Sequence, residues 1–255
     1  METLTQEKEF GFFRARQEGE ILHIRFQDNL LEHLVNFDSR DIVIQFIDQV
    51  SKSKQVKVIL INSDFGDTGC EAYARFILEK SQTLDRIDIH RLFNMTSQLV
   101  MGIISLDQIV IHVCSGCVIS LFLNVSLACD YRIASDETVF HNHYLDLGMI
   151  PVGGSPFLLS KRSGRANIWE TLLLNRTIDA AKALELGLVD RVVPLSGLDE
   201  AAREIALGFT ASSLGTIAGL KRLVNFSKKE LKAYFEMEEQ EIFRIIDSGS
   251  LRKET

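Results

Sequence analysis

The sequence predicts an α/β fold in which buried parallel strands alternate with helices. Short runs typical of strands occur at residues 56–61, 109–113 and 131–134, and the first two are rich in β-branched residues. Between them, apolar residues recur at helical spacing. This alternation is typical of parallel strands joined by crossover helices. After Pro151 the pattern changes to almost continuous helix.

The composition is that of a soluble globular chain of 255 residues, long enough for one large domain or for a domain with a helical appendage. The net charge of −7 argues against a nucleic-acid partner, which favours a basic surface. No apolar stretch approaches the roughly 20 residues of a membrane-spanning helix, and the polar, acidic N-terminus resembles neither a signal peptide nor a transit peptide. With only four cysteines, we expect a reduced cytoplasmic protein that has no membrane partner.

The first elements can be assigned in order. Residues 10–16 and 21–26 flank a turn at residues 18–20, which indicates a β-hairpin. Asp38 is a suitable N-cap for a helix with an apolar face that includes Phe46 and Val50. Strand 56–61 is followed by a loop at residues 64–70 and by helical segments through Met101. Strand 109–113, a helix over about residues 120–129 and strand 131–134 complete this half.

The second half opens at a glycine pair. Ser155 caps the next helix and Pro156 is its first helical residue. The last long helix carries one apolar face, which docks either on another subunit or on the chain's own core; its members are Leu231, Phe235, Ile242 and Ile246.

Several motifs recur in a fixed order between Gly116 and Pro194, at residues 127–134, 147–154, 172–180 and 183–194. In this stretch the chain resembles the crotonase family, the enoyl-CoA hydratases and isomerases. The resemblance implies a ββα spiral core over residues 1–194 and a helical C-terminal region over residues 195–255 that builds homotrimers or hexamers. It also implies a substrate that is an acyl-CoA or an acyl group on a carrier protein, coenzyme A being part of that substrate and no other cofactor being needed.

Crotonases hold the thioester oxygen between two backbone N–H groups. The family's first donor follows a glycine in a loop that resembles Thr68-Gly69-Cys70, so the resemblance places this donor at Cys70. A gapless count back from residue 130 places the second donor at Leu121. Amides in the first turn of a helix lack intrahelical partners and lie at the positive end of the helix dipole, which suits a developing oxyanion.

The chain departs from the family where the hydratases carry two catalytic glutamates. The gapless count places Asn124 and Tyr144 at those positions. Asn cannot ionise, and Tyr is a poor base near neutral pH because its ordinary pKa is about 10. We therefore expect neither standard hydration nor a simple double-bond shift, because general acid–base help contributes about 10²–10⁴-fold. A catalytically degraded binding or assembly subunit is the alternative.

The surroundings of the predicted pocket are also atypical. Ser120 and Phe122 add bulk at the glycine-rich turn and are expected to reshape the acyl pocket, and Gly148 belongs to the loop that closes it. The negative charges of Asp64 and Asp67 do not favour binding of the diphosphate of CoA. A thioester on a carrier protein is therefore an alternative to an acyl-CoA substrate.

For the cysteine and histidine motifs we prefer a structural role to a redox or metal-binding role. Cys114 and Cys117 form a CxxC motif, taken here as a buried structural pair rather than a redox or metal motif. His141 and His143 could share a strand face toward a metal, but no third ligand is evident, so no metal site is expected.

Other reactive groups near the site are given ordinary roles. The Cys70 amide is preferred to its thiol as the functional group. Glu71 and Asp146 are expected to be solvated carboxylates.

Overall fold

The computed structural model describes residues 7–27, 33, 37–63, 69–83, 86–144, 148–162 and 164–248. The predictions made for Asp64, Asp67, Thr68 and Asp146 therefore concern residues outside the described part of the chain.

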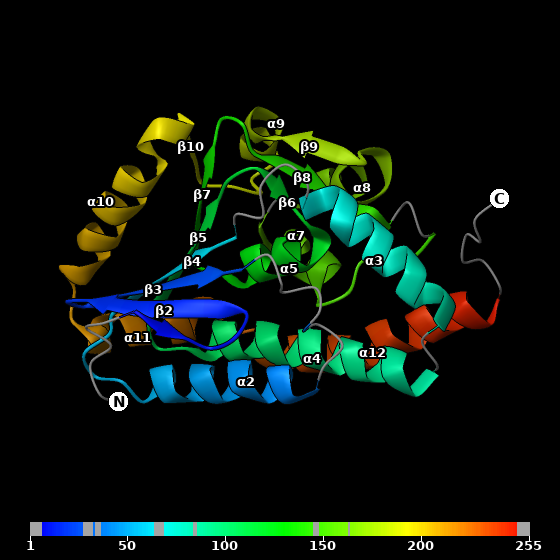
Figure 1. Ribbon diagram of the computed structural model, residues 1–255, viewed down its shortest axis with the longest axis horizontal. Coiled ribbons are helices and arrows are strands. Elements are labelled where there is room, and N and C mark those ends of the chain that lie inside the picture. Colours follow the sequence, from blue (N-terminus) through cyan, green and yellow to red (C-terminus); the bar gives the residue numbers. More distant parts are fainter. Residues whose placement is uncertain are drawn as a thin grey trace.

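In the described part of the chain, ten strands form two sheets (Figure 1). The larger has the order β1-β2-β3-β4-β5-β7-β10 and the smaller the order β6-β8-β9. Strands β1 to β3 pair antiparallel, and β3, β4, β5, β7 and β10 pair parallel in that order. The strands are β1 (Lys8–Glu9), β2 (Phe13–Glu18), β3 (Ile21–Phe26), β4 (Val58–Asn62), β5 (Ile109–Cys114), β6 (Cys117–Val118), β7 (Tyr131–Ser135), β8 (Val139–His141), β9 (Thr177–Asp179) and β10 (Arg191–Val193).

Helices cover both faces of the larger sheet. In the described part of the chain they are α2 (Phe37–Ser51), α3 (Gly69–Thr83), α4 (Arg86–Ser105), α5 (Ser120–Ala128), α7 (Ser155–Arg162), α8 (Gly164–Trp169), α9 (Ala180–Glu185), α10 (Leu198–Thr210), α11 (Leu214–Val224) and α12 (Lys228–Asp247). A π-helical turn covers Glu170–Leu174 and a 3-10 turn covers Leu195–Gly197.

The predicted α/β class and most of the early elements are confirmed. The hairpin, the three buried strands and helix α5 lie within three residues of the predicted bounds. The N-terminal helix begins at Phe37, one residue before the predicted cap. The second half is less uniformly helical than expected, because β9 and β10 interrupt it.

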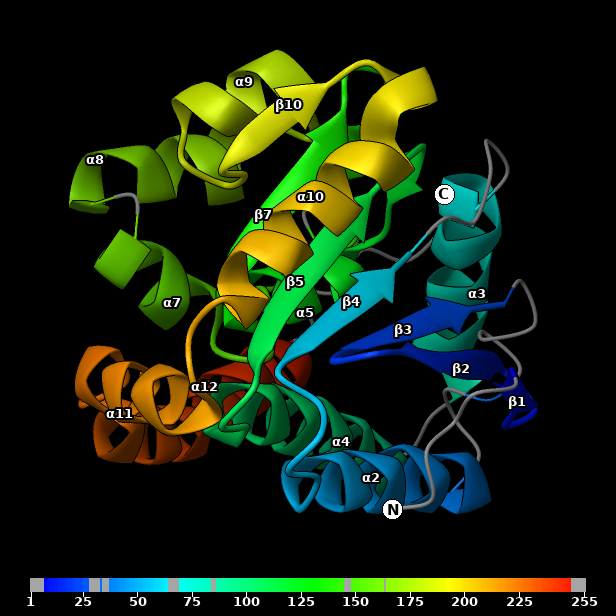
Figure 2. The same ribbon diagram turned by 90° about the vertical axis from the view of Figure 1, so that its left-hand side faces the viewer.

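Helix α10 lies across one face of the larger sheet (Figure 2) and packs Leu198, Ala202 and Ala206 against Ile21, Leu60 and their neighbours. The opposite face packs against α4 and α5 through residues such as Leu22, Ile59 and Val110. The small sheet and the start of α3 lie next to the N-terminal end of α5 (Figure 1).

The apolar face of α12 belongs to the chain's own core. Leu231 is 1% exposed and packs in the main core cluster, with Phe235 beside it. Ile242 is also 1% exposed and packs with Tyr144 and Val152. Of the two occupants that the sequence left open, the structure selects the chain itself, and this face cannot be used as evidence for a subunit interface.

Candidate active site

Helix α5 is the centre of the candidate site. All nine of its residues are buried, so its polar groups must find partners inside the protein. Strand β6 ends at Val118 and leads directly into this helix, which places the first-turn amides beside the small sheet. The backbone amide of Leu121 faces the hydroxyl of Tyr73, where it acts to lower the pKa of that hydroxyl. The amide predicted as the second oxyanion donor is therefore directed at an oxygen atom.

Tyr73 was not predicted from the sequence. It lies on α3, is 4% exposed, and packs its ring edge-on against His143 with the ring centroids 4.9 Å apart. Burial raises the pKa of its hydroxyl well above the ordinary value. The group that faces the Leu121 amide is thus a neutral hydroxyl.

The start of α3 meets the start of α5. Gly69 and Cys70 form the first helical residues of α3, and Tyr73 follows one turn later. The carbonyl oxygen of Cys70 lies 3.2 Å from Nε2 of His143. The residue predicted as the first oxyanion donor therefore lies beside the same end of α5.

Asn124 and Tyr144 are brought together, as two residues of one pocket wall should be. The Nδ2 atom of Asn124 donates to the Tyr144 hydroxyl at 3.2 Å, and Oδ1 accepts from the hydroxyl of Ser155. Asn124 is fully buried and Tyr144 is 9% exposed. Burial raises the pKa of Tyr144 above its ordinary value, so both groups are neutral near pH 7 and neither is a general base.

A buried carboxylate from the C-terminal helix lies next to this pair. Glu238 is 5% exposed and accepts hydrogen bonds from the backbone amides of Gly153 at 2.9 Å and Gly154 at 3.0 Å. Burial raises its pKa to about 7, although the two amides act in the opposite direction. Its charge also contributes to the raised pKa of Tyr144.

The glycine pair is the sequence signal that could have revealed this carboxylate. Gly153 and Gly154 have φ angles of 73° and 77°, which favour glycine. A side chain at Gly153 would come within 2.8 Å of Thr96 and 3.2 Å of the Asn124 amide nitrogen. Two consecutive amides in such a turn form a concave site that accepts an anion.

The other predicted residues divide into two groups. Ser120 is fully buried, and its hydroxyl accepts from the backbone N–H of His143 at 3.1 Å, which places it at the site. Phe122 packs against Phe26 and His112. It precedes Asn124 by two residues and therefore points to nearly the opposite side of α5. The prediction that Phe122 reshapes the acyl pocket stays a prediction. Gly148 adopts a φ of 67° in a turn beside Tyr144.

The two cysteines of the CxxC motif are not partners, which corrects the prediction. Cys114 is fully buried and its sulfur lies 3.1 Å from Nδ1 of His112. Cys117 instead forms a disulfide with Cys70, 47 residues earlier. The expectation that His141 and His143 have no third ligand beside them is also wrong, because Cys70 lies within reach of both.

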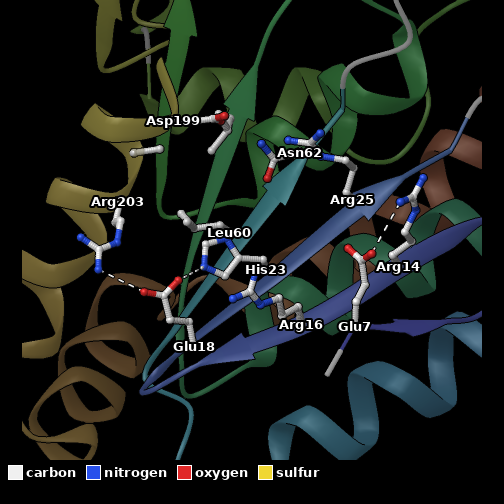
Figure 3. A pocket seen from close by; sticks show the side chains of 12 residues that line it. Glu7, Arg14, Arg16, Glu18, His23, Arg25, Leu60, Asn62, Asp199 and Arg203 are labelled. Carbon is white, nitrogen blue, oxygen red and sulfur yellow. Dashed lines mark hydrogen bonds and ion pairs between the residues drawn. The ribbon is translucent and has the colours of Figure 1, made fainter. Parts of the chain in front are cut away.

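A charged pocket of about 290 Å³ lies on the other face of the large sheet (Figure 3). Alternation along β3 directs His23 and Arg25 into it, whereas Leu22 and Ile24 face the core beside α5. Glu18 pairs with Arg203 at 3.0 Å and lies 3.9 Å from His23. The pocket is thus separated from the candidate site by the sheet.

The Glu238 carboxyl makes stability depend on pH. Its pKa rises from 4.5 in the unfolded chain to about 7 in the folded protein. Between these values the unfolded chain has lost the proton that the folded protein keeps, so stability falls as pH rises through this window, by about 3 kcal/mol in total. We expect urea unfolding to show a lower free energy of unfolding at about pH 8 than at about pH 4.5.

Two variants isolate the contribution of Glu238. Glu238→Gln should lose this pH-dependent difference, whereas Glu236→Gln, an exposed neighbour on the same helix, should keep it. An unchanged pH dependence in Glu238→Gln would contradict the assignment.

Comparisons with known proteins identify the family. The sequence profile of the enoyl-CoA hydratase/isomerase family matches residues 17–254. A trans-2-decenoyl-[acyl-carrier-protein] isomerase of Streptococcus mutans is 24% identical over 188 residues, which cover 71% of this chain and 69% of that protein. A carnitinyl-CoA dehydratase of Citrobacter koseri is 33% identical over 150 residues, 59% of this chain and little more than half (55%) of that protein.

Solved structures agree on the fold. The enoyl-CoA hydratase of Bacillus halodurans superposes with a TM-score of 0.80 at 17% identity, covering 94% of this chain and 97% of that one. The enoyl-CoA hydratase of Bacillus anthracis gives a TM-score of 0.74 at 19% identity, with coverages of 89% and 90%. Within the described residues, no helix combines the length and apolar character needed to cross a membrane. The profile match across most of the sequence, together with this fold, shows that the chain belongs to the enoyl-CoA hydratase/isomerase family, the crotonases.

Proposed function

We propose that the protein acts on an acyl thioester, carried by coenzyme A or by a carrier protein, and that the thioester oxygen replaces the Tyr73 hydroxyl at the Leu121 amide. The observation that carries this proposal is that the Leu121 amide, at the start of the buried helix α5, faces a side-chain oxygen. The amide is in the first turn of a buried helix, where it is available to an oxygen from outside the backbone. The Cys70 amide is the second donor in this proposal.

The names of the relatives support a thioester but leave the carrier open. One relative is described as acting on an acyl-carrier protein substrate and another on a CoA substrate. No further cofactor is required in this proposal, and we infer a cytoplasmic location.

The neutral pair Asn124 and Tyr144 directs the proposed chemistry away from hydration. Hydration needs an activated water and a protonated carbon, which a carboxylate supports. Decarboxylation of a malonyl-type thioester reaches an enolate by losing CO₂ and needs no base. In this reaction Asn124 or Tyr144 orients the departing carboxylate by hydrogen bonds, and the amides stabilise the enolate oxygen.

A second candidate is a catalytically degraded member that binds a partner or an acyl group without turnover. It is favoured by the same Tyr73 hydroxyl, which occupies the donor position, and by the closed contact of Asn124 with Tyr144 and Ser155.

Removal of the Tyr73 hydroxyl tests whether a thioester oxygen replaces it at the Leu121 amide. In Tyr73→Phe the Leu121 amide has no side-chain oxygen to leave, and a net hydrogen bond contributes about 0.5–1.5 kcal/mol. We therefore expect calorimetry to show that acetyl-CoA or malonyl-CoA binds about 3–10-fold more tightly to Tyr73→Phe than to the unmodified protein.

The matched control is Tyr131→Phe. The Tyr131 ring packs against Phe209 of α10 on the other face of the sheet, away from the Leu121 amide. This variant should bind as the unmodified protein does. Absence of binding in all three proteins would reject thioester binding in favour of the second candidate, and weaker binding in Tyr73→Phe would reject the displacement of its hydroxyl.

Hydration of crotonyl-CoA should be slow. Because neither Asn124 nor Tyr144 supplies a carboxylate, we expect a rate at least ~10²-fold below that of a family hydratase measured in parallel. Loss of the enoyl-thioester absorbance gives the rate. A rate comparable to the hydratase would show that the catalytic positions have been misplaced.

We also propose that the chain assembles as a homotrimer or hexamer, through apolar side chains that remain exposed at the end of α11 and beyond it. Leu223 is 75% exposed and Phe226 is 86% exposed. Light scattering at micromolar concentration should report three or six protomers, and Leu223→Asp combined with Phe226→Asp should give a smaller species with an unchanged circular dichroism spectrum. Ile87→Asp, at an exposed position on α4, is the control; a monomeric unmodified protein would overturn the proposal.

A further inference from the structure

Four side chains with sulfur or imidazole ligand atoms meet where the start of α3 contacts the small sheet. They are Cys70 on α3, Cys117 on β6, His141 at the end of β8, and His143 two residues later. The ligand atoms of Cys70, His141 and His143 all lie within 4.8 Å of one another, and the sulfur of Cys70 is joined to that of Cys117. The two imidazole rings have centroids 4.1 Å apart.

The register of the small sheet explains why these groups converge. Strands β6 and β8 are parallel, with Cys117 opposite Val139 and Val118 opposite Phe140. Side chains alternate between the two faces of a strand, so His141 extends from the same face as Val139 and Cys117. The start of α3 covers that face and adds Cys70, with a Cα–Cα distance to Cys117 of 5.8 Å.

Ser120 orients the histidines from the first residue of α5. Its hydroxyl donates to the His141 carbonyl at 3.3 Å and lies 3.2 Å from Nδ1 of His143. The Cys70 carbonyl oxygen, 3.2 Å from Nε2 of His143, can only accept, so in this structure Nε2 carries the proton and the lone pair on Nδ1 faces the Ser120 hydroxyl. When zinc binds at Nε2 the proton moves to Nδ1, where the Ser120 hydroxyl accepts it. Metal-binding histidines are usually held by such a hydrogen bond on the other ring nitrogen.

We propose that, when Cys70 and Cys117 are reduced, these two cysteines and the two histidines bind one Zn²⁺ in a tetrahedral site. Two thiolates and two imidazoles are a donor set that zinc prefers, with distances of about 2.3 Å to sulfur and about 2.0–2.1 Å to nitrogen. Such a site needs its ligand atoms about 3.3–3.8 Å apart. The ligand atoms of Cys70, His141 and His143 lie at most 4.8 Å apart and would move closer, whereas the sulfurs of Cys70 and Cys117, now bonded, would move apart.

Reduction of the disulfide precedes metal binding. A phosphine reduces the disulfide to two thiols and is itself oxidised to a phosphine oxide. Water supplies the oxygen of the oxide and both thiol protons. Zinc then displaces one proton from each thiol, so two protons are released for each metal bound.

Four protein ligands leave no open coordination position, which assigns a structural role to this zinc. It ties the start of α3, with Cys70 and Tyr73, to the small sheet and to the end of α5. The inference does not depend on the proposed thioester chemistry, because binding of the metal is measured without substrate.

The test uses the full chain, reduced with a phosphine and freed of metal by a chelator. Co²⁺ added in place of zinc should give the intense near-ultraviolet bands of cobalt–thiolate charge transfer and the visible bands of tetrahedral cobalt. Zn²⁺ should abolish both at one equivalent. Competition with a chromophoric chelator then gives the zinc affinity.

Matched variants assign the ligands. Cys117→Ser and His141→Gln should each lower the zinc affinity by at least ~100-fold, and Ser120→Ala by about 10–100-fold through the lost hydrogen bond to His143. Cys129→Ser and His90→Gln, which lie outside the cluster, should bind zinc as the unmodified protein does.

The cobalt spectrum of the unmodified protein needs no variant to fold, so it decides first. Absence of the charge-transfer bands in the reduced protein, or a disulfide that the phosphine does not reduce, would overturn the proposal. Bands that persist in Cys117→Ser and disappear in Cys129→Ser would do the same.

Discussion

Complete burial of helix α5 is the constraint on which the rest of the structure depends. A buried backbone or side-chain polar group without a partner costs about 1–3 kcal/mol, so the ends of this helix must be satisfied from inside the protein. At the C-terminal end, the fully buried guanidinium of Arg132 donates to the carbonyls of Ser126 and Cys129, both at 2.9 Å, and to Asp190. A cation at this end also complements the helix dipole. At the N-terminal end, the Tyr73 hydroxyl faces the Leu121 amide.

The same constraint explains why the middle of the helix is neutral. A charged side chain at the position of Asn124, which is fully buried, would need a compensating partner. Asn124 instead donates a hydrogen bond from its amide nitrogen to the Tyr144 hydroxyl and accepts one from the Ser155 hydroxyl at its amide oxygen. The nearby carboxyl group of Glu238 accepts hydrogen bonds from two glycine amides. Burial raises its pKa to about 7, so a large fraction of this group is also neutral near pH 7.

Sequence reasoning could predict what depends on local pattern and on the family's spacing. Alternation and β-branched runs predicted the strands beside α5, and the gapless count placed Asn124 and Tyr144, which lie 3.2 Å apart. It could not predict contacts made by residues from distant segments. Tyr73 and Glu238 reach the site from helices on either side of it in the chain, and neither carries a motif. The apolar face of α12 shows the same limit, because periodicity reveals that a face is covered but not which surface covers it.

The two proposals meet at the first turns of α3. Tyr73 follows Cys70 by three residues, so both side chains project from the same side of the helix. A metal that fixes the Cys70 sulfur to Cys117 holds the start of α3 against the small sheet. The Tyr73 hydroxyl must then leave the Leu121 amide by rotation of its own side chain and not by movement of the helix. The His143 ring, which packs edge-on against Tyr73, is in the proposed site a zinc ligand. Zinc bound to His143 therefore fixes one wall of the space in which the Tyr73 ring moves. Occupancy of the metal site is in this way coupled to the access of a substrate oxygen to the Leu121 amide.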